Sequence, residues 1–79
     1  MVSSMKQSIS RFGEKLHFLR TREKLTLQQL ANKLGLSAHG YISELENGKK
    51  LPTVEFTLKV SRLFDVTIDE FLKDEIEID

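Results

Sequence analysis

Residues 26–46 read Thr26-Leu-Gln-Gln-Leu-Ala-Asn-Lys-Leu-Gly-Leu-Ser-Ala-His-Gly-Tyr-Ile-Ser-Glu-Leu-Glu46, and this stretch decides the fold. Thr26 followed three residues later by Gln29 fits a capping box, which marks the start of a helix. Gly35 marks the end of that helix, because glycine takes the left-handed conformation at low cost. One apolar face repeats at helical spacing in between, at Leu27, Leu30, Ala31 and Leu34.

A further helix is expected within five residues of Gly35, from about Ala38 to Glu46. Ser37 is a candidate cap for its start, and Asn47-Gly48 closes it. Its inward positions are Tyr41, Ile42 and Leu45. Two short helices joined by a tight turn are typical of a helix-turn-helix, although any pair of helices joined by a short loop gives the same spacing.

Three more helices surround this pair, so the sequence predicts an all-α, five-helix domain over residues 8–73. The first helix runs from about Ile9 to Glu23, with Ser8 or Ser10 as its cap and a stripe formed by Ile9, Phe12, Leu16 and Leu19. Thr53 caps the fourth helix, which ends near Phe64, and Thr67 with Glu70 opens the fifth with a second capping box. Residues 1–7 are expected to form a flexible arm. Residues 74–79 form an acidic tail in which isoleucine alternates with acid, and this pattern suits either a strand or a frayed end.

The formal charge of the chain is zero, but its distribution is uneven. Up to Phe64 eleven Lys and Arg face five Asp and Glu, a net charge of +6, and from Asp65 onward the net charge is −6. A basic body with an acidic end favours a polyanionic partner, or else an ordinary solvated surface with a solubilising tail.

Composition also excludes several classes of protein. The 79 residues contain no cysteine, which rules out disulfides and thiolate metal sites and fits a cytoplasmic location. No apolar run is long enough for a membrane span, and residues 1–10 lack the apolar core of a signal peptide. No His, Asp or Glu cluster has metal-ligand spacing, no catalytic arrangement is suggested, and no cofactor is expected.

Particular residues then carry a resemblance across about three quarters of the chain. They are Phe12-Gly13, Leu16, Leu19-Arg20, Leu25-Thr26, Leu30-Ala31, Leu34-Gly35, Tyr41-Ile42-Ser43, Leu45-Glu46-Asn47-Gly48-Lys49, Pro52-Thr53 and Val66-Thr67-Ile68-Asp69-Glu70. Residues 12–72 thereby resemble the lambdoid phage repressor and Cro family of Xre-type regulators. The resemblance implies a lambda-repressor-like fold whose second and third helices form the helix-turn-helix. It also implies DNA binding and a partly buried ion pair between Arg20 and Glu46.

Three positions depart from the family pattern. Leu27 stands where a glutamine usually contacts a phosphate, and Lys24 stands where a glycine is usual, so Lys24 is expected to adopt a positive φ. The stretch from Gly35 to Tyr41 is one residue longer than in the commonest members. This insertion shifts the expected base-contacting positions by about one residue.

The DNA-contacting candidates follow from the expected third helix and the loop after it. The base-reading candidates are Ala38, His39, Gly40, Ser43 and Glu44, and Glu44 is suited to accept from a cytosine amino group. The phosphate candidates are Gln28, Tyr41, Asn47, Lys49 and Lys50. Alternative interpretations remain: Tyr41 as a half-buried packing residue, Asn47 as a helix cap, the lysines as an ordinary basic loop, and His17 and His39 as inert surface residues.

The fourth helix carries two apolar faces. Val54, Leu58 and Ser61 form one, which we expect to pack on the core. Phe56, Val60 and Leu63 form the other, about 200° away by helix geometry. This second face, with Phe71 or Ile76, is the candidate homodimer interface; the alternative is that both faces are buried in one domain.

The sequence therefore predicts a regulator of transcription that binds double-stranded operator DNA as a homodimer. Within that class a repressor, a restriction-system controller and an antitoxin remain open. A protein-interaction module on the same fold is the alternative from a different class, and the zero net charge, Leu27, Phe18 and Phe56 favour it.

Overall fold

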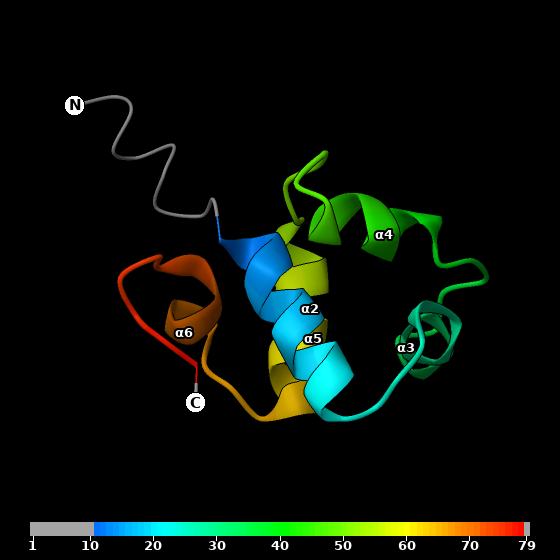
Figure 1. The fold of residues 1–79 in the computed structure, drawn as a ribbon, viewed down its shortest axis with the longest axis horizontal. Coiled ribbons are helices and arrows are strands. Elements are labelled where there is room, and N and C mark those ends of the chain that lie inside the picture. Colours follow the sequence, from blue (N-terminus) through cyan, green and yellow to red (C-terminus); the bar gives the residue numbers. More distant parts are fainter. Residues whose placement is uncertain (1–10, 79) are drawn as a thin grey trace.

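The computed structural model describes residues 11–78 as five helices joined by short connections (Figure 1). In chain order they are α2 (Phe12–Arg22), α3 (Leu27–Lys33), α4 (Gly40–Glu46), α5 (Val54–Phe64) and α6 (Ile68–Leu72). The described residues contain no strand, so the all-α prediction is confirmed and residues 74–78 are not strand-like. The expected arm, the start of the first helix at Ile9 and its candidate caps Ser8 and Ser10 lie outside the described residues, as does Asp79.

Three threonines begin three of the helices, as their sequence context predicted. The hydroxyls of Thr26, Thr53 and Thr67 each accept a hydrogen bond of 3.0 Å from the backbone N–H three residues later. At Thr26 and Thr67 the side chain of the third residue also accepts from the backbone N–H of the threonine, at 2.8 Å, which completes both capping boxes. Each cap satisfies donors that the first turn of a helix otherwise leaves unpaired.

Four helix ends share one backbone motif. After α2, α3, α4 and α5 the chain turns through a residue with positive φ: Lys24 (60°), Gly35 (78°), Gly48 (75°) and Asp65 (57°). The following N–H then reaches back to a carbonyl in the last turn, for example Leu36 to Ala31 at 2.9 Å. This is the Schellman geometry, and it confirms the predicted helix end at Gly35 and the positive φ of Lys24.

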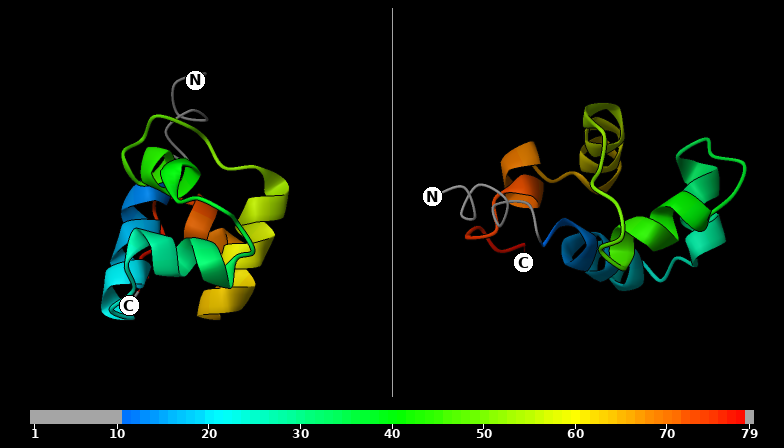
Figure 2. Two further views of the ribbon diagram at one scale, coloured as in Figure 1. Left: turned by 90° about the vertical axis from the view of Figure 1, so that its right-hand side faces the viewer. Right: turned by 90° about the horizontal axis from the view of Figure 1, so that it is seen from above.

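The core lies between α2 and α5, with α6 packed against both of them and α4 packed against α2 (Figures 1 and 2). The ring of Phe12 from α2 meets Phe71 from α6 at a centroid distance of 4.9 Å and Phe56 from α5 at 6.4 Å. Aliphatic side chains fill the remaining space, and the most deeply buried are Leu16, Leu19, Leu30, Ala31, Ile42, Leu45 and Val60.

The two faces of α5 are not divided as predicted, because Ser61 of the first face is buried and Leu63 of the second face is exposed. Phe56 and Val60 are buried, whereas Val54 is 79% exposed. The reason is that α5 turns its aromatic face toward Phe12 and Tyr41, whose rings lie 6.4 and 5.2 Å from that of Phe56.

This placement removes three of the five candidate dimer residues from the surface. Phe56, Val60 and Phe71 all pack within their own domain, and Ile76 is half-buried. Leu63, at 38% exposed, remains at the surface.

The C-terminal segment, residues 73–78, is held against α2 by two cationic side chains that the sequence pattern does not mark as functional. The Lys15 ammonium is buried and donates to the carbonyls of Glu70, Lys73 and Ile76 at 2.5, 2.6 and 2.7 Å. Burial lowers the pKa of Lys15, while the three acceptors favour its charged form. Lys15 thereby satisfies carbonyls at the end of α6 and in the segment that follows it.

Arg11 makes the second tie to this segment. Its guanidinium donates to both carboxylate oxygens of Glu77, at 2.8 and 3.1 Å, and to the Asp74 carbonyl at 2.8 Å. Hydrogen bonding to Glu77, and then to Glu14, raises the pKa of Arg11, and the same contact lowers the pKa of Glu77. Residues 74–78 are therefore held along α2 by charged hydrogen bonds.

Candidate nucleic-acid interface

Helices α3 and α4 form the helix-turn-helix, and the turn between them is longer than the sequence suggested (Figure 2). Helix α4 begins at Gly40, two residues later than predicted, so Ala38 and His39 precede it. His39 occupies the N-cap position with φ −95° and ψ 2°, and no side chain caps the helix. Ser37 is therefore not the cap, because it lies two residues before the N-cap position.

The base-reading candidates divide into two groups in the structure. Ala38, His39 and Gly40 are exposed at the start of α4, while Ser43 and Glu44 are half-buried one turn further on. An added Cβ at Gly40 would meet nothing within 4 Å, so the backbone there is open to close approach. All five lie within two helical turns of the N-terminus of α4. A helix-turn-helix presents this end of its second helix to the major groove.

The loop from residue 47 to residue 53 is fixed at both ends. At its start the Lys49 N–H donates to the Glu44 carbonyl at 2.8 Å and the Gly48 N–H to that of Leu45 at 3.1 Å. At its end the Thr53 N–H donates to the Tyr41 hydroxyl at 3.3 Å. Lys49 and Lys50 are thereby presented, exposed, from a loop of defined shape.

The remaining phosphate candidates occupy different settings. Gln28 is exposed on the first turn of α3 and donates to Asn32 at 3.1 Å. Asn47 is exposed at the C-terminal end of α4, where it also occupies the C-cap position. Tyr41 is half-buried, and its ring makes an edge-to-face contact with that of Phe56. Its hydroxyl oxygen accepts the hydrogen bond from the Thr53 N–H, so its O–H is still able to donate to a phosphate.

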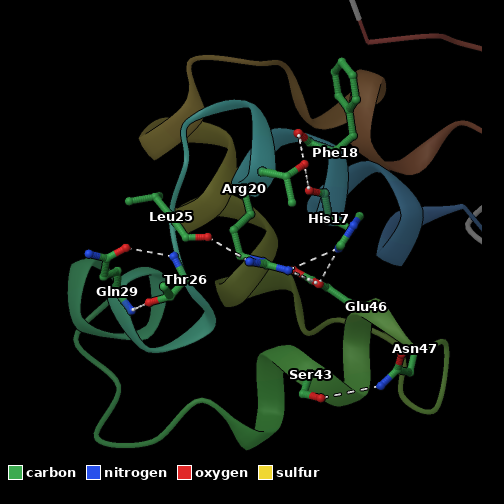
Figure 3. Close-up of polar contacts among 10 residues, drawn as sticks. His17, Phe18, Arg20, Leu25, Thr26, Gln29, Ser43, Glu46 and Asn47 are labelled. Carbon is green, nitrogen blue, oxygen red and sulfur yellow. Dashed lines mark hydrogen bonds and ion pairs between the residues drawn. The ribbon is translucent and has the colours of Figure 1, made fainter.

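Arg20 joins α2 to the end of α4 in the ion pair that the resemblance implied (Figure 3). Its Nε and Nη2 donate to the two carboxylate oxygens of Glu46 at 2.7 and 3.1 Å, and its Nη1 donates to the Leu25 carbonyl at 2.8 Å. The side chains are 13% and 8% exposed, so the pair is largely desolvated. Arg20 thus fixes α4 and the chain entering α3 relative to α2.

His17 belongs to the same cluster and is not an isolated surface residue. Its Nδ1 lies 2.9 Å from Glu46 and 3.2 Å from Arg20 Nη2 (Figure 3). His17 and Arg20 lie three residues apart on α2, so they share one face of the helix. This spacing could have indicated from the sequence that His17 lies beside the ion pair.

Replacing Arg20 by alanine is expected to destabilise the domain by about 3–5 kcal/mol, because Glu46 would remain largely buried without its partner. Thermal and urea unfolding measure the loss. Arg62→Ala, which removes an exposed arginine from α5, is the control and is expected to change stability by less than about 1 kcal/mol. Equal unfolding curves for the two variants would contradict the structural role of the pair.

The described residues meet the requirements of neither a metal site nor a membrane-spanning helix. Across residues 11–78 no three His, Asp or Glu side chains gather closely enough to hold a metal ion. None of the described helices is long and apolar enough to cross a membrane.

Comparison with known proteins agrees with this geometry. A helix-turn-helix domain family model matches residues 13–76. The chain is 47% identical over 64 residues to the HTH-type transcriptional activator BcrR of Enterococcus faecalis, covering 81% of this chain and 31% of that protein. It is 56% identical over 39 residues to the HTH-type transcriptional repressor RghR of Bacillus subtilis, covering 49% of this chain and 28% of that protein.

A solved structure supports the same arrangement of helices. The restriction-modification controller protein C.AhdI of Aeromonas hydrophila superposes with a TM-score of 0.69 at 28% identity, covering 80% of this chain and 94% of the controller. The chain spans only about a third of the activator and repressor it matches, so the match to them concerns the region of the helix-turn-helix. The family model, the relatives and the superposition agree, and the chain belongs to the helix-turn-helix domain family in its phage-repressor-like form.

Proposed function

We propose that this protein is a sequence-specific regulator of transcription that reads double-stranded operator DNA with the N-terminal end of α4. One observation carries the proposal: the exposed start of α4 lies beside a basic loop whose two ends are both held by hydrogen bonds to α4 residues. A reading element and a phosphate-binding element are thus fixed relative to each other, as DNA recognition requires. The relatives named as transcriptional activator and repressor support it.

The residues divide by the part of DNA they would meet. Residues 38–40, with Ser43 and Glu44, would face base edges in the major groove. Lys49 would meet a phosphate, as would Gln28, Asn47 and the hydroxyl of Tyr41. We also propose a cytoplasmic location, which fits the bacterial source of these relatives and the cysteine-free composition.

Replacing Lys49 by alanine is expected to weaken binding to every DNA sequence alike and to lower the salt slope, d log K/d log[salt], by about 0.9 in magnitude. Replacing His39 or Ser43 by alanine is expected to change the preferred base instead. Binding measured across salt concentrations, on sequences selected from a random pool, tests both effects. A wild-type affinity that barely responds to salt would favour a protein-interaction module over a regulator.

We also propose that the protein binds its operator as a homodimer, since a pseudo-palindromic site needs two recognition helices about one DNA turn, roughly 34 Å, apart. After the burial of Phe56, Val60 and Phe71, the exposed apolar residues at the α5–α6 corner are Leu63 and Ile68. Leu63→Glu is expected to leave the domain folded and to shift sedimentation toward the monomer. A wild type that stays monomeric at micromolar concentration and on DNA would rule the dimer out.

A further inference from the structure

An ion pair links the reading helix to the phosphate-binding loop. The Lys50 ammonium lies 3.2 Å from a carboxylate oxygen of Glu44, and the two side chains are 54% and 44% exposed. The same ammonium lies 5.9 Å from the centre of the Tyr41 ring, within the range of a cation–π contact. Lys49, one residue earlier, makes no ion pair with any of residues 11–78. The two neighbouring lysines are therefore in different electrostatic states.

Backbone hydrogen bonds at both ends of the loop place the pair. The Glu44 carbonyl accepts the Lys49 N–H that closes the end of α4, and the Tyr41 hydroxyl holds the Thr53 N–H at the other end of the loop. Because both ends of the loop are fixed, Lys50 reaches either the Glu44 carboxylate or an approaching phosphate by changing side-chain rotamers alone.

The major groove presents mostly acceptors to a carboxylate. Guanine offers N7 and O6 and thymine offers O4, all acceptors. Adenine offers an amino group at N6, but its N7 acceptor lies beside it and repels a carboxylate. Cytosine offers the amino group at N4 without a neighbouring acceptor on the same base. If the Glu44 carboxylate meets no donor on the DNA, it keeps its ion pair with Lys50. Its negative charge then also repels the phosphates of the DNA backbone. If the carboxylate accepts a hydrogen bond from a base amino group, that bond replaces the ion pair with Lys50.

We propose that Glu44 and Lys50 act as a latch that makes phosphate binding by Lys50 depend on the base that Glu44 meets. On a base without a donor, Glu44 retains Lys50, and the contact to phosphate is not made. On a cytosine amino group, Glu44 is satisfied, and Lys50 is released to the backbone. Glu44 is thus a specificity-determining residue that acts partly through Lys50, and this inference rests on the DNA-binding function proposed above.

The latch predicts a gain of binding when Glu44 is removed. On a mixed-sequence duplex of nonspecific DNA, Glu44→Ala is expected to bind about two- to fivefold tighter, the range of an exposed ion pair. Its salt slope should increase in magnitude by about 0.9, because Lys50 then neutralises a phosphate on any sequence. Fluorescence anisotropy of a labelled duplex across salt concentrations measures both quantities.

Two double variants separate the latch from simple charge removal. Lys50→Ala should change the slope on nonspecific DNA little in the wild type but lower it by about 0.9 in the Glu44→Ala protein. Lys49→Ala is the matched control, since it removes the neighbouring lysine and should lower the slope equally in both backgrounds. In sequences selected from a random pool, a preference for cytosine at one position should be present in the wild type and lost in Glu44→Ala.

The outcomes against the latch are distinct from those against DNA binding. If Lys50→Ala lowers the slope equally with and without Glu44, the two residues act independently and the latch is wrong. If Glu44→Ala binds more tightly even when Lys50 is also alanine, Glu44 acts only through its own charge, and the latch is again wrong. A wild-type affinity without salt dependence overturns the regulator function itself, and the latch with it.

Discussion

Replacing Gly13 by alanine is expected to lower the free energy of unfolding by about 3 kcal/mol or more, at or above the upper end of the usual cost of overpacking. Helix α2 passes so close to the end of α4 that an added Cβ at Gly13 would overlap the Leu45 carbonyl oxygen and lie 3.0 Å from that of Glu46. Both neighbours are backbone atoms, so no rotamer change can make room. The two helices would have to separate, which would also strain the Arg20–Glu46 ion pair that joins them.

Thermal unfolding measures this loss, and about 4–8 °C of melting temperature per kcal/mol is expected for a domain of this size. Gly40→Ala is the matched control, because Gly40 also lies in a helix but an added Cβ would meet nothing within 4 Å. That control is expected to be neutral or to stabilise by about 0.5–1 kcal/mol through helix propensity. Equal melting temperatures for Gly13→Ala and Gly40→Ala would show that α2 and α4 lie further apart.

Replacing Lys15 by methionine is expected to cost about 3 kcal/mol or more. Lys15 is 3% exposed and its ammonium donates to three backbone carbonyls, and a buried acceptor without its donor costs about 1–3 kcal/mol. Detachment of residues 73–78 would rehydrate some of these carbonyls, which limits the loss. The variant should therefore show both lower global stability and local opening.

Urea unfolding measures the global change, and hydrogen exchange measures the local one. The N–H groups of Lys73 and Ile76, which donate to Asp69 and Lys73 in the structure, should exchange faster in Lys15→Met than overall unfolding explains. Lys24→Met removes an exposed lysine from the end of α2 and is the control for loss of charge. Unchanged protection at both amides would show that Lys15 does not hold the C-terminal segment.

Local chemistry determined much of the fold directly from the sequence. A helix cap involves atoms within about four residues of one another, so Thr26, Thr53 and Thr67 identified three helix starts, and Gly35 and Gly48 identified two ends. The Arg20–Glu46 pair joins residues 26 positions apart, and only the family resemblance suggested it.

Other features depended on parts of the chain that are distant in sequence. Lys15 stands on the buried stripe between Phe12 and Leu16, where a charge is unexpected, and its acceptors lie 55 to 61 residues away. The sequence predicts the start of α4 two residues too early, because Ser37 is a residue type that commonly caps helices. In the structure His39 occupies the N-cap position and the helix begins at Gly40.

The sequence by itself determined that this protein is a five-helix domain, since capping, helix ends and apolar spacing are encoded within a few residues, and the family resemblance implied its phage-repressor-like form. Only the tertiary structure decided which face of α5 is inside. Both faces are apolar, and the choice depends on the rings of Phe12 and Tyr41, which α2 and α4 bring to Phe56 from distant positions in the chain. The same is true of the pairing of Glu44 with Lys50: the hydrogen-bonded loop after α4, and not their spacing, brings the two charges together.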